Sequence, residues 1–486
     1  MVATRAQLIW IPSSGVGHLV SAVEIAKLLV ERDDRLSITL LVLNPPRASK
    51  SNPFAELLAS VSSSTASAAK SQIRFQELPY EDDPSGLGAK SNMSLAERHK
   101  PQVRAAVAEL TRALDSPPLA GFIIDMFCTP MIDVANEFGV PSYMFFTCSA
   151  AFLGFMFHVL ALQDDEGKDL SEFKDSDAKL DIPTLVNPLP AKVFPTVVLD
   201  EEHRVWFLGA ARRFRETKGI VINSFEKLEP NALKSLLGDD KIPPVYPVGP
   251  ILNLEVTGRS DKSSEILSWL DAQPSSSVVF LCFGSVGSFH DDQVNQIAHG
   301  LEKSGHRFLL SLRRPPPTGM LRAYPEEYEN LAKVLPEGFL ERTSERGKVI
   351  GWAPQVEVLA HPSVGGFVTH CGWNSTLESL WFGVPIAAWP LYAEQQFNAF
   401  MMVVEHGMAV EVKMDYRNDL GMETKEIVDS EVIEKAVQKL MKADGHDEKK
   451  EKVRQMSERS REALAEGDSS HLAIGRFIGD VFKNIP

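Results

Sequence analysis

Short apolar runs alternate with longer amphipathic segments along most of the chain. Near the start, residues 8–11 and 38–43 are apolar, and residues 19–30 between them carry a mostly apolar helical pattern. Apolar runs joined by helix-length crossovers predict βαβ units, because parallel strands are buried on both faces. The same alternation continues through an apolar run at 122–124, a helical segment at 131–138 and a further run at 143–146.

A second series of the same kind begins at residue 278. Its apolar runs predict strands at 278–283, 307–312, 348–351, 366–369, 384–389 and 408–412, and its amphipathic segments predict helices at 291–304, 374–382 and 394–406. Two such series predict two doubly wound α/β domains, since each set of parallel strands needs its own helical cover.

The proline-rich segment 243–250 separates the two series. It has four prolines in eight residues, which is typical of a stiff linker. We therefore expect an acceptor-binding domain at 1–245, a linker at 246–262 and a donor-binding domain at 263–465. A C-terminal helix at 466–486 is expected to pack back on the first domain. The charged stretches 80–100 and 163–187, which contain Pro and Gly, predict loops.

Charge and cysteine content narrow the functional classes. The 486-residue chain has a net charge of −15, which disfavours binding to nucleic acid or to an anionic membrane surface. Its four cysteines form no CxxC pair, which favours reduced thiols and a cytoplasmic location. The apolar stretch 144–162 is interpreted as a strand at 142–147 followed by a buried helix, rather than as a membrane span. We expect a monomer.

Residues 365–375 predict a strand, a tight turn and a helix that begins near Asn374. The start of such a helix is an anion site, and His370, Asn374 and Ser375 add possible donors to a diphosphate. The alternative is that Ser375 and Glu378 form only a capping box. Trp352 and Trp373 near this turn favour a nucleotide sugar, because aromatic rings stack on bases and sugar rings.

A second candidate group lies in the first half. Residues 15–18 read GVGH after the first predicted strand, and Asp125 ends the strand at 122–124. Strands of one parallel sheet present their carboxyl ends at one edge, so His18 and Asp125 can meet there. An aspartate on one imidazole nitrogen leaves the other nitrogen as a base. A structural histidine and a turn-capping aspartate are the alternatives. A dinucleotide fingerprint fails, because Val20 stands where its third glycine belongs.

The window 352–395 resembles the signature of the plant UDP-sugar-dependent glycosyltransferases. Its 44 positions include WAPQ at 352–355, HCGWNS at 370–375, Glu378, GVP at 383–385 and an acidic-Gln pair at 394–395. The resemblance implies two facing Rossmann-like doubly wound domains (the GT-B fold) with a cleft between them. It also implies that the acceptor binds the first domain and the UDP-sugar binds the second.

The resemblance further implies a role for each matching residue. His18 would be the catalytic base and Asp125 its partner. Trp352 would stack on uracil, Ala353 would bond its edge through the backbone, and Gln355 and Glu378 would hold the ribose. The diphosphate would be held by Ser285, His370, Asn374 and Ser375, and the sugar by Trp373, Glu394, Gln395 and Thr147. Gln395 at the final position favours UDP-glucose over UDP-galactose, and Glu394 replaces the commoner aspartate.

The sequence therefore predicts an inverting glucosyltransferase that makes a β-O-glucoside from UDP-glucose as co-substrate. No metal-ligand spacing is present, and no cofactor is expected. The acceptor is expected to be a lipophilic hydroxylated molecule. The sequence does not distinguish a flavonoid from another phenol or a terpenoid. Two alternative functions stay open. One is the same transfer from another UDP-sugar donor, and the other, less favoured, is that of a nicotinamide-dependent oxidoreductase. Candidate acceptor contacts, which are equally good core residues, are Met126, Phe127, Phe145, Phe146, Phe194 and Tyr392.

Overall fold

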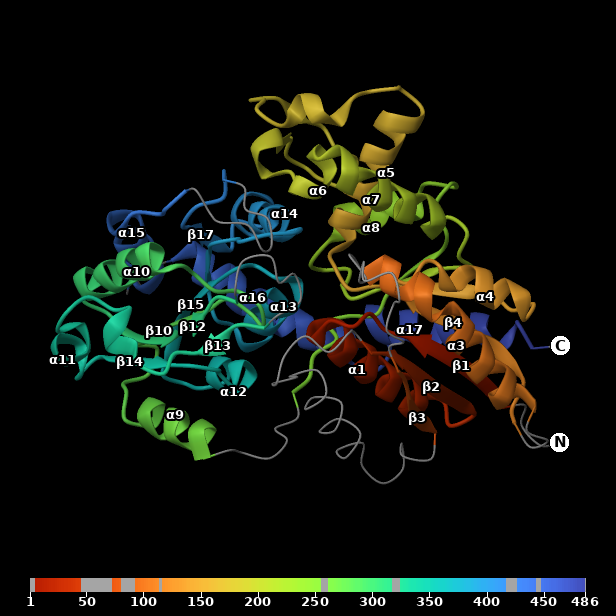
Figure 1. Ribbon diagram of the computed structural model, residues 1–486, viewed down its shortest axis with the longest axis horizontal. Helices are drawn as coiled ribbons and strands as arrows, with labels where there is room; N and C mark the ends of the chain where they lie inside the picture. Colours follow the sequence, from red (N-terminus) through yellow and green to blue (C-terminus); the bar gives the residue numbers. More distant parts are fainter. Residues whose placement is uncertain are drawn as a thin grey trace. The chain divides into compact units, whose positions relative to one another are not determined.

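The structure, a computed structural model, describes residues 5–44, 72–79, 92–112, 116–254, 261–316, 324–416, 426–442 and 447–485. The chain divides into two compact units (Figure 1). The first unit consists of Met1–Gly167, Val205–Asn253 and Glu462–Pro486, and the second of Lys168–Arg204 and Leu254–Arg461. The segment 168–204, from the first half of the sequence, thus belongs with the second unit.

The first unit is built on a parallel sheet of seven strands in the order β3-β2-β1-β4-β5-β8-β9. The strand order reverses between the neighbouring strands β1 and β4, and ligands of doubly wound sheets bind outside the carboxyl ends of the strands at such a point. The strands are β1 (Ala6–Ile11), β2 (Leu36–Leu43), β3 (Ile73–Leu78), β4 (Leu119–Asp125), β5 (Ser142–Phe146), β8 (Ile220–Ile222) and β9 (Val245–Pro247).

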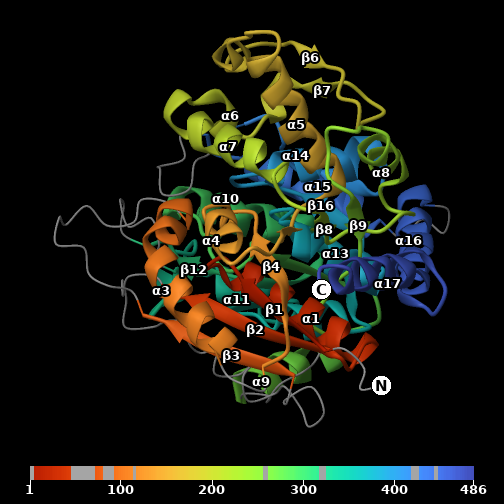
Figure 2. The same cartoon turned by 90° about the vertical axis from the view of Figure 1, so that its right-hand side faces the viewer.

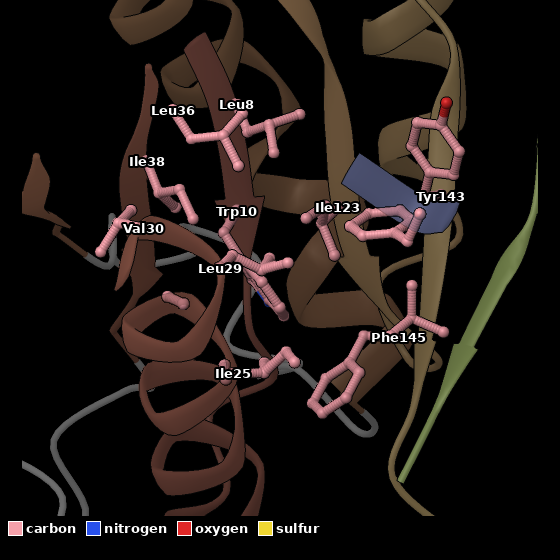
Figure 3. Packing of buried hydrophobic residues seen from close by; sticks show 14 of the residues in the cluster. Leu8, Trp10, Ile25, Leu29, Val30, Leu36, Ile38, Ile123, Tyr143 and Phe145 are labelled. Carbon is pink, nitrogen blue, oxygen red and sulfur yellow. The ribbon is translucent and has the colours of Figure 1, made fainter. Parts of the chain in front are cut away.

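One face of this sheet is covered by α1 (Val16–Arg32) and α17 (Ser469–Phe482). Figure 3 shows side chains of this core, including Ile25 and Leu29 from α1 together with Trp10 and Phe145 from the strands. The rings of Trp10 and Phe145 meet edge to face, with centroids 5.4 Å apart. This core fixes the position of α1, and with it the residues of its first turn.

Further helices of the first unit are α3 (Asn92–Arg112), α4 (Met131–Glu137), α5 (Ala150–Asp164), α7 (Glu201–Phe214) and α8 (Pro230–Leu237). In Figure 2, α3 and α4 lie side by side, and they contact strands β2 to β5. The helix α5 begins with Ser149 as its N-cap, and Glu229 accepts hydrogen bonds from the backbone N–H groups of Ala150 and Ala151. Within the described ranges, no helix is both long and apolar enough to cross a bilayer.

The second unit is built on six parallel strands in the order β14-β11-β10-β15-β16-β17. Its order reverses between β10 and β15, so this unit has the same kind of binding edge as the first. The strands are β10 (Val278–Cys282), β11 (Arg307–Ser311), β14 (Gly347–Ile350), β15 (Val364–Thr369), β16 (Ile386–Ala388) and β17 (Ala409–Glu411), and a separate pair is formed by β12 (Arg313–Arg314) and β13 (Glu326–Glu327).

Helices α10 (Asp291–Ser304) and α15 (Ser430–Met441) pack together in the second unit. The buried stripe of α10 follows helical spacing through Val294, Ile297, Ala298 and Leu301. The other helices are α9 (Asp261–Asp271), α11 (Phe339–Thr343), α12 (Gln355–Leu359), α13 (Trp373–Phe382), α14 (Gln395–Phe400), the π-helical turn η5 (Met401–Glu405), the 3₁₀ turn η4 (Leu331–Lys333) and α16 (Glu448–Leu464).

The segment 168–204 contacts the rest of the second unit through η3 (Ala191–Val193), which packs near α14, and through the carboxylate of Glu405. Glu405 accepts hydrogen bonds from the backbone N–H groups of Val186 and Asn187, at 2.9 and 2.8 Å, and from the side-chain amide of Asn187. Before α7 begins at Glu201, the segment contains only short elements, namely η2 (Leu170–Phe173), β6 (Lys179–Leu180), β7 (Leu189–Pro190), η3 and α6 (Thr196–Leu199).

The predicted α/β fold with two doubly wound parallel sheets is confirmed, but two local predictions are wrong. The proline-rich segment 243–250 is not only a linker, because Val245–Pro247 form β9 at the edge of the first sheet, where proline is tolerated. The loop predicted at 80–100 ends earlier, because α3 begins at Asn92, while residues 80–91 lie outside the described ranges, as do 255–260 of the predicted linker.

Candidate functional site

The first candidate group lies where β1 and β4 end, at the reversal of strand order in the first unit. His18 stands in the first turn of α1, which follows β1, and Asp125 is the last residue of β4. Nδ1 of His18 lies 2.7 Å from Oδ2 of Asp125. The structure therefore brings together the two residues that the sequence predicted as a pair.

The surroundings of Asp125 determine which imidazole nitrogen carries the proton. Asp125 is only 1% exposed, and its other oxygen accepts a hydrogen bond from the backbone N–H of Phe127 at 3.0 Å. Because an ionised carboxylate only accepts hydrogen bonds, Nδ1 of His18 must be the donor, and Nε2 keeps its lone pair. The His18 side chain is 24% exposed, so it has access to solvent or to a ligand.

Two more predicted residues border the imidazole. The Thr147 hydroxyl lies 3.3 Å from Nδ1 of His18, in the first unit and on the nitrogen that faces Asp125. The ring of Phe127 lies with its centroid 5.4 Å from that of His18. Gly15 leaves room for the ring, since a Cβ at this position would come within 3.0 Å of it.

The remaining acceptor candidates have different surroundings. Phe145 and Phe146 are fully buried; Phe145 packs on Trp10, and Phe146 packs on Phe152 and Phe214. Phe194 is also buried and packs on Phe173 within segment 168–204. Met126 is 5% exposed and lies near Thr147, while Tyr392 is half-buried in the second unit. Of the first-unit candidates, Phe127 is therefore the most accessible.

The second candidate group lies at the strand reversal of the second unit, between β10 and β15. The imidazole of His370 is buried between two glycines, because a Cβ at Gly284 or at Gly372 would lie 2.5 or 2.6 Å from its Nε2. Burial, helped by the charge of Arg313, lowers the pKa of His370 to about 4. His370 is therefore neutral near pH 7 and acts as a hydrogen-bonding group rather than a cation.

The turn that follows β15 has a strained backbone. Cys371 has a φ of 61°, in the left-handed region that non-glycine residues avoid, and its carbonyl accepts a hydrogen bond from the side chain of Asn398 at 3.0 Å. The helix α13 then begins at Trp373 with Gly372 as its N-cap. The capping-box alternative is wrong, because Gly372 has no side chain to cap with and Ser375 instead bonds Gln355.

The predicted ribose contacts form one hydrogen-bonded group between α12 and α13. The Gln355 amide donates to Glu378 at 2.7 Å and to Ser375 at 2.9 Å. Burial raises the pKa of Glu378 to about 7, although the hydrogen bond from Gln355 opposes this shift. Ala353 is 7% exposed at the turn that leads into α12, and Trp352 beside it is 50% exposed, unusually open for a tryptophan.

The predicted sugar contacts lie at the start of α14. Gln395 is 4% exposed, and its side-chain oxygen accepts hydrogen bonds from the backbone N–H groups of Leu391 and Tyr392, at 2.9 and 3.1 Å. Glu394 is half-buried and follows Ala393, whose φ is 57°. Trp373 differs from Trp352, because its side chain is only 3% exposed and its ring is not an open stacking surface.

The sequence reasoning missed Arg313. This residue follows β11, is 5% exposed, and donates hydrogen bonds to the carbonyl oxygens of Gly284, Ser285 and Gly287. Its guanidinium lies 5.1 Å from the centroid of the Trp352 ring. No signal in the sequence distinguishes Arg313 from the adjacent Arg314, because the partners of Arg313 are backbone carbonyls.

Across the described ranges, no group of three or more His, Cys, Asp or Glu side chains is placed to hold a metal ion. None of the four cysteines forms a disulfide, and all four are buried.

Comparison with known proteins identifies the family. The model of the UDP-glucoronosyl and UDP-glucosyl transferase family matches residues 240–450. The chain is 52% identical over 484 residues to UDP-glucose flavonoid 3-O-glucosyltransferase 6 of Fragaria ananassa, covering 98% of each chain. The chain belongs to this family of plant UDP-glycosyltransferases.

Solved structures give the same result. A UGT transferase from Siraitia grosvenorii in complex with UDP is 47% identical, with a TM-score of 0.88 over 98% of this chain and 100% of that chain. Medicago truncatula UGT71G1 complexed with UDP-glucose is 40% identical, with a TM-score of 0.84 over 98% of each chain. The predicted family, its GT-B type of fold and the enzyme class of UDP-glycosyltransferases are therefore confirmed.

Proposed function

We propose that this protein transfers glucose from UDP-glucose to a hydroxyl group of a flavonoid or a related phenol, and that the product is a β-O-glucoside. The observation that carries this proposal is the His18–Asp125 pair at the carboxyl edge of the first sheet, in a chain of this family. The relative from Fragaria ananassa is named for glucosylation of flavonoids at the 3-hydroxyl, which supports this acceptor class.

In the proposed reaction His18 is the catalytic base. Its Nε2 takes the proton from the acceptor hydroxyl while Asp125 holds Nδ1 and stabilises the imidazolium that forms. The acceptor oxygen then forms a bond to the anomeric carbon as the bond from that carbon to the diphosphate breaks. One displacement inverts the configuration, so an α-linked donor gives a β-linked product.

The second unit holds the donor in this proposal. Trp352 stacks on uracil, the Ala353 backbone bonds its edge, and Gln355 with Glu378 holds the ribose hydroxyls. The diphosphate is held by Ser285, His370, Asn374 and Ser375 at the start of α13. The positive end of that helix stabilises the charge that develops on the leaving group.

The sugar contacts complete the donor assignment. Glu394 accepts hydrogen bonds from glucose hydroxyls, and Gln395 donates to them, because its side-chain oxygen is already used by two backbone N–H groups. Trp373 contributes through its backbone, since its ring is buried. Thr147 acts beside His18 rather than as a separate sugar contact.

The acceptor is proposed to lie against Phe127 and Met126, which are next to His18 and Thr147. We further propose that the enzyme works as a monomer in the cytoplasm, where its buried thiols stay reduced. Since the helix end and polar groups can meet the diphosphate charge, the proposed mechanism requires no divalent ion.

The test is a matrix of UDP-glucose, UDP-galactose and UDP-glucuronic acid against flavonols, simpler phenols and terpenoid alcohols. Mass spectrometry reports transfer, and the anomeric proton coupling in NMR reports the configuration. We expect a β-glucoside of a flavonoid, formed from UDP-glucose in the presence of a chelator. Products from another UDP-sugar alone, or an α-linked product, would overturn the donor or the mechanism. Wild-type protein that binds UDP but glucosylates no member of the panel would overturn the acceptor class.

A further inference from the structure

Among the described residues, Arg313 is a buried cation that has no acidic side-chain partner. It is 5% exposed, and in the described part of the chain the nearby ion pair with Glu326 is made by Arg314, not by Arg313. Buried arginines are normally paired with carboxylates, because an isolated buried charge is costly. Here the guanidinium is instead met by carbonyl oxygens of Gly284, Ser285 and Gly287, all from the turn that follows β10.

The same guanidinium also lies near Trp352, at the nucleobase end of the expected nucleotide site. Its carbon lies 5.1 Å from the centroid of the half-exposed Trp352 ring, a distance at which a cation is attracted to an aromatic face. Gly284 in turn lies against His370, which lines the expected diphosphate position. One side chain therefore connects the turn at the diphosphate end with the ring at the nucleobase end.

Few other residues can supply a positive charge in this region. The window 352–395, which supplies most of the expected donor contacts, contains no Lys or Arg. His370 cannot supply a positive charge near pH 7, because burial and Arg313 itself lower the pKa of this histidine. A diphosphate bound beside Gly284 and His370 would thus meet the fixed charge of Arg313 through the turn that Arg313 holds.

We propose that Arg313 is a positioning residue for the donor, which holds the 284–287 turn and the Trp352 ring in one binding geometry and adds positive charge behind the diphosphate. This inference rests on the proposed use of a UDP-sugar. A lysine keeps the charge but cannot bond three carbonyls with a planar fork or stack on the ring. A methionine of similar length removes both the charge and the fork.

The experiment measures the Kd of UDP by calorimetry for R313K, R313M, W352L and the double variant R313M/W352L. We expect R313K and R313M each to weaken UDP binding by roughly tenfold or more. We also expect the effects of R313M and W352L not to multiply in the double variant, because both disturb the same geometry. KM for UDP-glucose should rise more than kcat falls, as expected for a residue that positions the donor.

A matched control exists at the other end of α13. Arg461 stacks on Trp381 at 5.4 Å, in the same unit and with the same chemistry, but away from the proposed site. R461M, W381L and their double variant should bind UDP like the wild type. Should R313M prove unstable by circular dichroism, R313K retains the buried charge and provides the same comparison.

Two results would overturn the inference. One is UDP affinity in R313K and R313M within about twofold of the wild type, and the other is effects of R313M and W352L that multiply as independent changes. These results leave glucosylation by the wild type intact, so they refute the role of Arg313 alone. A wild-type protein that does not bind UDP would instead refute the proposed function together with this inference.

Discussion

The imidazole of His18 and the carboxylate of Asp125 lie 2.7 Å apart, although 107 positions separate them in the sequence. Neighbouring parallel strands make this contact possible, since β1 and β4 pair with Ile11 opposite Ile124 and so end at the same edge. The backbone N–H of Phe127 fixes the second carboxylate oxygen. The pair is therefore positioned by the end of β4, which holds Asp125, and by the first turn of α1, which holds His18.

Replacing Asp125 with asparagine should leave the donor site intact and remove the orientation of His18. An asparagine amide can present an N–H to Nδ1, which favours the tautomer with its proton on Nε2 and so removes the base. We expect kcat to fall on the order of 10²–10⁴, the range for loss of general-base catalysis, with little change in UDP affinity. Steady-state kinetics and calorimetry measure the two effects separately.

The chain offers a matched control for this substitution. His203 and Asp200 form another His–Asp contact, at 2.9 Å, but both side chains are about half exposed. D200N should therefore leave kcat unchanged. If D125N and D200N showed equal activity, the pairing of His18 with Asp125 would have no catalytic meaning.

Much of the fold was predictable because its central strands are apolar on both faces. The helix 291–304 was predicted with the bounds observed for α10, and the strands of the second sheet were found within a few residues. The first sheet was predicted less completely, because its strands β3, β8 and β9 were missed. The strand β9 contains a proline and pairs only at the sheet edge, while α3 begins in a polar stretch that lacks the apolar run of the central elements.

The positions of His18, Asp125 and His370 were predictable because Asp125 and His370 lie at strand ends and His18 lies in the first turn of the helix after β1. Burial could not be predicted in the same way. From the sequence, Trp352 and Trp373 are equally good candidates for stacking on a ligand. In the structure the first is half exposed and the second is buried in α13. Arg313 was missed because its partners are backbone carbonyls, which carry no signature in the sequence.

Glu378 should make both stability and ligand binding depend on pH near neutrality. Its pKa in the folded protein is raised to about 7, above its ordinary value of 4.5, because it is buried. A carboxyl group whose pKa is raised on folding contributes its full stability when the pH is below its pKa in the unfolded state. This contribution is lost as the pH rises through 7. The loss amounts to roughly 3 kcal/mol at most. E378Q should therefore gain stability relative to the wild type between pH 5 and pH 8 in thermal melts.

Uridine tests the binding side of this prediction, because it has no phosphate that titrates in the same range. If ribose hydroxyls donate to Glu378, binding favours the ionised carboxylate and releases a proton. The affinity of the wild type should then rise with pH through 7, and E378Q should lose this dependence. Identical pH profiles for the two proteins would exclude Glu378 as a ribose contact.

Gly284→Ala should disrupt the diphosphate end of the site. A Cβ at this position would lie 2.5 Å from Nε2 of His370, and the φ of 73° adds backbone strain of about 1–2 kcal/mol. G305A separates the two causes, because Gly305 has a φ of 74° and nothing within 4 Å of its Cβ position. We expect G305A to lower the melting temperature but bind UDP normally, whereas G284A should also lose UDP affinity. Equal UDP affinity in both variants would mean that the His370 contact does not matter.

Gln395→Glu should separate recognition of the sugar from recognition of UDP. In the structure the Gln395 side-chain oxygen accepts from the N–H groups of Leu391 and Tyr392, so only its amide hydrogens remain for a ligand. A glutamate can keep both backbone hydrogen bonds but cannot donate, and it places a second carboxylate beside Glu394. We therefore expect KM for UDP-glucose to rise by roughly tenfold, the cost of a lost hydrogen bond from a buried group, while the Kd of UDP stays unchanged. Kinetics with UDP-glucose and calorimetry with UDP make the comparison. An equal loss for both ligands would show that the substitution distorts the loop before α14, and no loss for either would remove Gln395 from the sugar site.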